Sequence, residues 1–335
     1  MRRMNSIPMV ILCLAPIFIF LTIILSILYG AKNIDFETTW NAIFHFDSSN
    51  VNHNIIITSR LPRVVAALLV GAFLAISGAL MQGMTRNYLA SPSIMGVTDG
   101  SAFVITICMV FLPGMSSVNM ILCSMLGSAL GAGIVFGFGS LLRNGLSPVR
   151  LAIIGTVIGT FLSSISAAIA SYFQVSQNIS FWYNAKLHQV DPNVIKLAIP
   201  FGIVGIILAL LISKSITILS LGEEVSVNLG QRTKLVKATA IISVIFLTGT
   251  AVALVGKIGF VGLIIPHITR FLIGVDYKWI IPCAGVIGGL FLALCDIVSR
   301  FVNYPFETPI GVVTSLIGIP FFLYLIRTRG GEKHA

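Results

Sequence analysis

The segment Ser213–Lys237, SKSITILSLGEEVSVNLGQRTKLVK, is a polar interruption between two long apolar segments. Val194–Ile212 comes before it and Ala238–Val255 follows it. Apolar segments of about 20 residues are long enough to cross the hydrocarbon core of a bilayer as helices. We therefore expect Ser213–Lys237, called the polar island below, to be a loop on one side of a membrane that joins two spanning helices.

A short helix is predicted inside the polar island. Ser220 and Glu223 have the S-x-x-E spacing of a capping box, in which the hydroxyl accepts a backbone N–H and the carboxylate reaches back to the start of the helix. Glu223 and Glu224 would both lie in the first turn, where carboxylates complement the helix dipole. A helix this short is marginal alone in water, so it needs a surface to pack against.

The apolar side chains of this helix form a stripe. Leu221, Val225 and Leu229 recur every fourth residue and would share one face, while Gly230 suits the end of the helix. The spacing fits an ordinary connecting loop, and it also fits a docking helix for a cytosolic partner. The residues of the island alone leave both interpretations open.

Composition decides the class of protein. Of the 335 residues, 56% are hydrophobic and only 10% are charged, and the mean hydropathy is +1.00. Such a chain is typical of a polytopic, all-α membrane protein. The net charge of +10 does not indicate nucleic-acid binding, because the basic residues are scattered among short loops instead of forming a patch.

About ten spanning helices are predicted. They cover residues 7–29, 61–83, 94–112, 118–142, 149–173, 193–212, 238–255, 258–273, 279–299 and 309–326. The eighth is short and is broken by Pro266, so the count is nine or ten. With ten spans and a cytosolic N-terminus, twice as many of the 21 basic residues lie inside as outside, as the positive-inside rule requires. Both termini and the polar island are then cytosolic.

The longest outer segment, Gly30–Ser59, ends at Arg60 and Arg63. Arginines at this position are interfacial anchors in many membrane proteins. They run against the charge bias of the chain, however, and could instead pair with carboxylates of an external protein.

Small and polar residues mark helix contacts and a candidate pathway. Four pairs have G-x-x-x-G spacing, which lets helices approach closely: Gly127/Gly131, Gly133/Gly137, Gly155/Gly159 and Gly285/Gly289. In the fifth span a stripe is formed by Thr156, Thr160, Ser163 and Ser164. These hydroxyls either bond to their own helix carbonyls or line a water-filled path.

The loop Arg86–Gly100 is rich in turn-forming residues and is predicted to be structured and partly re-entrant. Asp99 lies near its end, where a carboxylate is costly unless it is paired or hydrated. It is either a helix N-terminal residue or a group that lines a cavity.

Catalytic signals are missing from the sequence. The five histidines show no metal-ligand spacing, and Gly256-Lys257 lacks the rest of a phosphate-binding loop. Transport energy would then come from a partner or from an ion gradient, for which Asp99 and Asp296 are the candidate coupling acids. An intramembrane enzyme built on His267 would lack a nucleophile–base pair.

Four stretches resemble the permease subunits of the ferric-siderophore and cobalamin ABC importers, which have the type II importer fold. They are RLPRVVAALLVGAFLAISGALMQGMTRNYLASPSIMGVTDG (Arg60–Gly100), LGEEVSVNLG (Leu221–Gly230), GKIGFVGLIIPHITRFLIG (Gly256–Gly274) and DIVSR…ETPIGVVTSLIGIPFFLYLIR (Asp296–Arg327). The resemblance covers the chain after its first span, with the four motifs in the same order as in the family.

The resemblance implies one permease domain over residues 1–335, in the cytoplasmic membrane of a bacterium, with residues 213–237 as the coupling-helix loop. The implied partners are a cytosolic ATPase dimer, a second permease subunit (identical or paralogous) and an extracytoplasmic substrate-binding protein. ATP would be bound by the ATPase, so this chain would hold no cofactor or metal and would not be an enzyme.

The resemblance also assigns site residues. The residues expected to dock the ATPase are Ser220, Leu221, Glu223, Glu224, Val225, Leu229 and Gly230. Those expected to pair with the binding protein are Arg60, Arg63 and Arg300. The pathway wall would include Thr156, Thr160, Ser163 and Ser164, and the cytosolic gate Ser147, Pro148 and Val149, within the connection Arg143–Arg150. An iron–siderophore complex is the first expectation for the cargo. Cobalamin and haem are the alternatives, and an ion-coupled secondary carrier is the rival mechanism.

Overall fold

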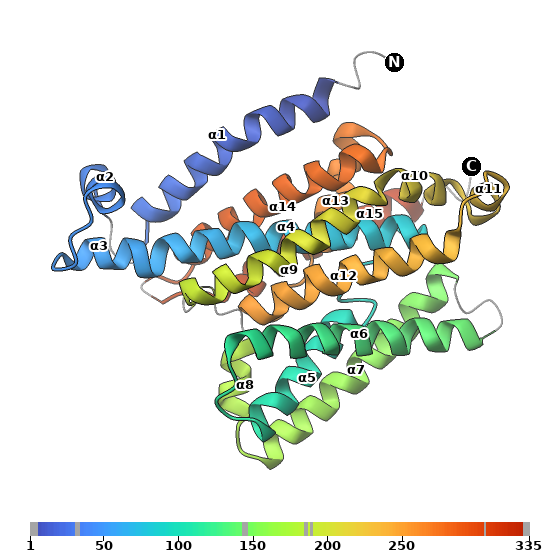
Figure 1. Cartoon of the computed structure of the whole chain (residues 1–335), viewed down its shortest axis with the longest axis horizontal. Coiled ribbons are helices and arrows are strands. Elements are labelled where there is room, and N and C mark those ends of the chain that lie inside the picture. The colour runs from blue at the N-terminus through green and yellow to red at the C-terminus, as the bar shows by residue number, and fades with distance from the viewer. Residues whose placement is uncertain are drawn as a thin grey trace.

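The computed structural model describes residues 6–30, 34–142, 147–183, 187, 190–304 and 306–330. Within these residues the chain is helical, and its only β pairing is a single bridge between Asn303 and Phe306. The elements are α1 (Ser6–Leu28), α2 (Phe36–Phe44), α3 (Val51–Ile55), the π-helix η1 (Ile56–Arg60), α4 (Leu61–Thr85), α5 (Val97–Phe111), α6 (Ser117–Leu141), α7 (Pro148–Tyr172), α8 (Ser176–Tyr183), α9 (Pro192–Leu211), α10 (Ser213–Leu221), α11 (Glu223–Asn228), α12 (Thr233–Val255), α13 (Val261–Ile273), α14 (Tyr277–Ser299) and α15 (Ile310–Gly330), arranged as in Figure 1.

The long helices coincide with the predicted apolar segments. In the described part of the chain, seven helical stretches are long and apolar enough to cross a membrane: α1, the continuous run from α3 to α4, α6, α7, α9, α12 and α14. Three shorter apolar helices, Val97–Phe111, Val261–Ile273 and Ile310–Tyr324, match the remaining predicted segments. The expectation of an all-α protein with many membrane-spanning helices is therefore confirmed.

Helix α4 is the centre of the core. Most of its residues are buried, including Val70, Phe73 and Leu80, and it packs on α12, α13 and α14. By contrast, α1 and α7 bury only a small part of their apolar surface, as expected of helices at the edge of a membrane bundle. Figure 1 shows α4 running through the middle of the molecule, with α5 to α8 grouped on one side.

Glycines set the closest helix contacts. A Cβ on Gly71 would lie 2.2 Å from the Gly288 carbonyl oxygen, and one on Gly78 would lie 1.8 Å from that of Gly262. Three of the four predicted G-x-x-x-G pairs lie against neighbouring elements in the same way: Gly127/Gly131, Gly155/Gly159 and Gly285/Gly289. The prediction of a helix contact within the chain is wrong for Gly133/Gly137, because among the described residues no neighbouring element lies within 4 Å of a Cβ at either position.

Pro266 does not break the eighth span. α13 continues through it as one helix, although proline removes the N–H that would bond to the carbonyl four residues earlier. That carbonyl belongs to Gly262, and Gln82 of α4 donates to it at 3.4 Å and to the Leu263 carbonyl at 3.2 Å. A side chain from the neighbouring helix therefore compensates for the missing bond.

The loop before α5 is structured, as predicted. Arg86 ends α4 in the left-handed conformation with φ +51°, and Gly96 precedes α5 with φ +71°. Between them Ala90, Ser91 and Met95 are buried. α5 consequently begins inside the bundle and is shorter than the other long helices.

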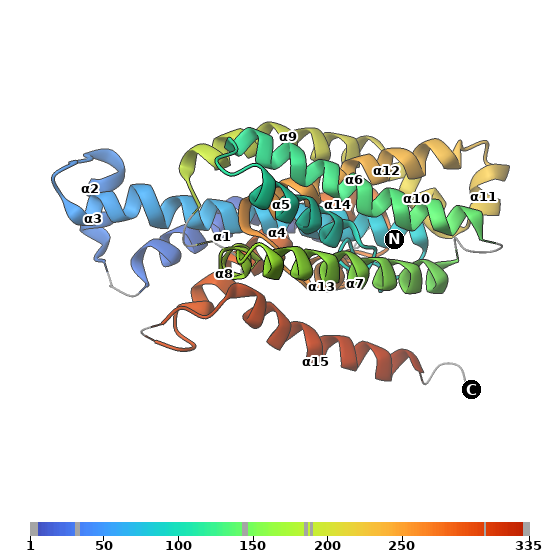
Figure 2. The same cartoon turned by 90° about the horizontal axis from the view of Figure 1, so that it is seen from below.

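The helix bundle has two ends along its long axis. α11 lies at one end of the long axis, and α2 and α3 lie at the other (Figure 1). In the perpendicular view of Figure 2, α7, α8 and α15 lie along one side of the bundle. The candidate sites fall at the two ends and on this side.

Candidate functional site

The polar island folds into α10 and α11, which meet at Gly222 with φ +143°. The predicted capping box is wrong. Ser220 lies in the last turn of α10, so its hydroxyl donates to the Thr217 carbonyl at 2.7 Å instead of capping α11. Glu223 accepts a hydrogen bond from Lys237 Nζ at 2.7 Å, which ties α11 to α12.

The prediction that one helix carries the apolar stripe is wrong, because Leu221 ends α10, Val225 lies in α11 and Leu229 follows the last residue of α11. The three side chains, still called the stripe below, are nevertheless exposed. Leu221, Val225 and Leu229 are 65%, 43% and 66% exposed. Glu224 is exposed beside them, and Gly230 follows with φ +76°. Exposed apolar side chains on a short helix form a surface that suits contact with another protein.

A cleft of about 580 Å³, called the inner cleft, lies behind the island. Its walls come from α4, α6, α7 and α12 and include Arg86, Ser147, Pro148, Glu223 and Lys237. The structure thus brings two of the predicted gate residues and one predicted docking residue to the same cavity.

The third predicted gate residue, Val149, lies outside the inner cleft. This residue is 70% exposed. Residues 143–146 of the same connection, which include Arg143, lie outside the described residues.

The polar stripe of α7 lines a second cavity, called the side cleft, of about 530 Å³. Its lining includes all four predicted pathway residues: Thr156, Thr160, Ser163 and Ser164. Thr156 also donates to the Ala152 carbonyl at 2.8 Å, so one hydroxyl of the stripe is bonded within its own helix. Ser163 is bonded instead to a carboxylate across the cleft.

That carboxylate is Asp99, and it completes a compact ionic triangle. Lys257 Nζ lies 2.7 Å from Asp99 Oδ1 and 3.1 Å from Ser163 Oγ, and Ser163 donates to the same carboxylate at 3.0 Å. The Lys257 ammonium also lies 5.0 Å from the centre of the Tyr183 ring. The two alternatives predicted for Asp99 both hold, since the residue lies in the first turn of α5 and its carboxylate lines a cavity.

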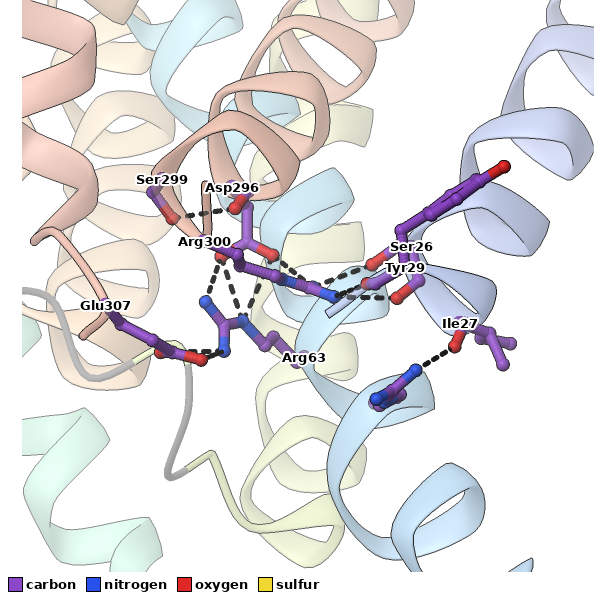
Figure 3. Close-up of polar contacts among 9 residues, drawn as sticks. Ser26, Ile27, Tyr29, Arg63, Asp296, Ser299, Arg300 and Glu307 are labelled. Atoms are coloured by element: carbon purple, nitrogen blue, oxygen red, sulfur yellow. Dashed lines mark hydrogen bonds and ion pairs between the residues drawn. The ribbon is translucent and has the colours of Figure 1, made fainter. Parts of the chain in front are cut away.

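At the opposite end, an arginine cluster joins α1, α4 and α14 (Figure 3). Asp296, at the end of α14, accepts from Arg63 Nε at 2.9 and 3.1 Å and from Arg300 Nη2 at 2.5 Å. Arg63 also donates to Glu307 at 2.7 and 2.9 Å. Asp296 is only 1% exposed, so its charge is compensated by two guanidinium groups within the chain.

Arg300 and a third arginine, Arg60, cap the C-terminal end of α1. Arg300 donates to the carbonyls of Ser26 and Tyr29 at 2.7 and 3.0 Å, and Arg60 donates to the Ile27 carbonyl. The last carbonyls of a helix have no partner within the helix and form the negative end of its dipole. Cations placed there stabilise the end of α1.

Arg60, Arg63 and Arg300 are thus brought together, as a shared docking role requires. They are buried, however, and bonded within the chain. Their contact with an external protein stays a prediction, and it would require some of these internal bonds to be exchanged.

Sequence reasoning missed Lys257 and Glu307 as site residues. In the sequence Lys257 stands out only beside Gly256, in an incomplete phosphate-binding loop, and no spacing indicates that it is the partner that Asp99 needs. In the described residues no group of three or more His, Cys, Asp and Glu side chains could hold a metal ion.

The chain is similar to known transport proteins over almost its full length. The profile of the FecCD transport family matches residues 17–328. The iron-uptake system permease protein FeuB of Bacillus subtilis (strain 168) is 59% identical over 97% of each chain. The iron(3+)-hydroxamate import system permease protein FhuB of the same organism is 53% identical over 90% of this chain and 79% of its own length.

A solved structure has the same fold. It is an inward-facing conformation of an ABC transporter of the metal-chelate type, with a TM-score of 0.81 and 28% sequence identity. The alignment covers 96% of this chain and 99% of the solved chain.

Proposed function

The chain belongs to the FecCD transport family, and from this membership we propose that it is the permease subunit of an ABC importer that carries an iron–siderophore complex across the cytoplasmic membrane of a bacterium. The observation that carries the proposal is the 59% identity, over 97% of both chains, to an iron-uptake permease. Both relatives described above have iron in their names, which favours an iron chelate over cobalamin or haem as the cargo.

The proposed energy source is a separate ATPase. ATP would be bound and hydrolysed by two cytosolic subunits, and this chain would contribute no catalytic residue. A second permease, identical or paralogous, and an extracytoplasmic binding protein would complete the importer. The solved structure of this fold, which is described as an ABC transporter, supports this assembly.

The proposed mechanism is alternating access driven through the polar island. The exposed stripe of Leu221, Val225 and Leu229 would bind the ATPase. The island and the start of α7 share the inner cleft, so a movement of α11 would be passed to Ser147 and Pro148. α7 carries the polar stripe of the side cleft, and its displacement would open the pathway to one side of the membrane and then to the other.

The stripe provides the test of this arrangement. In one variant Leu221, Val225 and Leu229 are all changed to Ser. The amount of ATPase that co-purifies with this variant should fall about tenfold or more, because truncating several anchor side chains at an interface costs several kcal/mol of binding free energy. The measurement is purification of the tagged chain in mild detergent from its own cells, with the bound proteins quantified and iron-chelate uptake followed in parallel. Val51→Ser is the matched control, since Val51 is 68% exposed at the opposite end of the bundle.

Two outcomes would contradict the proposal. A stripe variant that keeps both the ATPase and uptake would refute the docking surface. Uptake that survives ATP depletion but stops when ion gradients collapse would show a secondary carrier instead of an ABC importer.

A further inference from the structure

The ionic triangle of Asp99, Ser163 and Lys257 lies between two cavities. Asp99 and Ser163 line the side cleft. Lys257 lines a third cavity of about 320 Å³, bounded by Tyr183 and by α15 residues such as Ser315. Of the described residues that line these two cavities, Lys257 and Asp99 are the only charged ones.

The triangle is more accessible than the ion pair between Arg300 and Asp296. The side chains of Lys257 and Asp99 are 28% and 21% exposed, whereas those of Arg300 and Asp296 are 3% and 1% exposed. A charge that only holds helices together is best buried and fully bonded, as Asp296 is. A partly open pair that lies beside two cavities can exchange its partner for a ligand.

The geometry also allows the pair to separate without leaving Asp99 unbonded. Ser163 donates to the carboxylate independently of Lys257. The Lys257 ammonium has three donors, and the Tyr183 ring stabilises its charge from one side. Tyr183 is itself held in place, because its hydroxyl donates to the Ala102 carbonyl at 3.0 Å.

We propose that the Asp99–Lys257 pair is a cargo contact in the pathway wall, where Lys257 leaves Asp99 to donate to the oxygen atoms of an anionic or oxygen-rich metal chelate. This inference rests on the proposed importer function and names the residues that meet the cargo. Because Asp99 competes for the ammonium, the chelate is held only weakly and can move on. The pair therefore gives the pathway a preference for oxygen-rich cargo without a permanent trap.

The two partners should respond in opposite directions to loss of charge. Lys257→Met removes the donor and should raise the KM for uptake about tenfold, the effect of losing one charge-assisted hydrogen bond. Asp99→Asn removes the competitor and should lower the KM and slow turnover, because the cargo is released more slowly. Lys257→Arg keeps the charge and should stay within about twofold of the wild type.

The experiment uses the complete importer in proteoliposomes with ATP and its binding protein. The probes are a trianionic iron(III) tricatecholate and a neutral iron(III) trihydroxamate. The melting temperature of each importer variant is measured in parallel. Opposite KM shifts in the two single variants at unchanged melting temperature support the proposal.

The outcomes that overturn the inference are separate from those that overturn the function. If Lys257→Met and Asp99→Asn both lower uptake and melting temperature, and the double variant restores both, the pair is a structural tie. If the wild-type importer takes up neither iron chelate, the proposed function fails and the inference fails with it.

Discussion

At the scale of single residues, Asp296 is the group that holds together the arginine cluster at one end of the bundle. Its carboxylate lies between Arg63 and Arg300, and these arginines connect it to Glu307 and to the end of α1. Removing one partner from a buried ionic cluster leaves charges that neither water nor protein compensates. The internal role of the cluster is thus separable from any contact with a binding protein.

Asp296→Asn should therefore lower the free energy of unfolding by about 3–5 kcal/mol, the usual cost of breaking a buried ion pair. The measurement is thermal unfolding of the purified chain in detergent. Glu307→Gln is the matched control: this side chain is 37% exposed, and a surface ion pair contributes only about 0–1 kcal/mol. Equal losses of stability in the two variants would show that Asp296 is not the centre of the cluster.

At the scale of elements, the contact between α4 and α13 depends on the absence of a side chain. Gly78→Ala would place a Cβ 1.8 Å from the Gly262 carbonyl oxygen, so one of the two helices must move. Overpacking of this kind costs about 1–3 kcal/mol, and the shift would also disturb the bonds from Gln82 to α13.

We expect Gly78→Ala to melt at a lower temperature in detergent than the wild type. Gly133→Ala should not lower stability and should raise it by up to about 1 kcal/mol, because no neighbouring element lies within 4 Å of the added methyl group and alanine is favoured over glycine inside a helix. The packing argument fails if the two alanine variants cannot be distinguished.

The sequence predicts these elements better than it predicts their partners. Apolar length is enough to locate the long helices, but the four-residue spacing of Leu221, Val225 and Leu229 does not show the break at Gly222 that separates α10 from α11. The capping box failed because Ser220 belongs to the preceding helix, a boundary that the S-x-x-E pattern does not contain. Lys257 and Asp99 are 158 positions apart, so only the packing of α5, α7 and the 256–260 turn brings them together.

At the scale of the whole molecule, the charge distribution predicts the orientation in the membrane. With ten spans, the polar island and both ends of the chain are cytosolic and the loop before α3 is external. Four apolar helices follow the island: α12, α13, α14 and α15. α13 has only 13 residues, so whether it crosses decides on which side of the membrane α15 ends.

Single cysteines at exposed positions test this topology in a background without the five native cysteines. Ser48→Cys, before α3, should react with a membrane-impermeant maleimide on intact cells. Asn228→Cys, at the end of α11, should react only after the membrane is permeabilised. Arg327→Cys should behave like Asn228→Cys if all four helices after the island cross the membrane. The cysteine at position 327 could instead react from outside while the cysteine at position 228 stays protected. The chain would then cross the membrane an odd number of times between these two positions. α13 would then be a re-entrant helix, and the chain would span the membrane nine times.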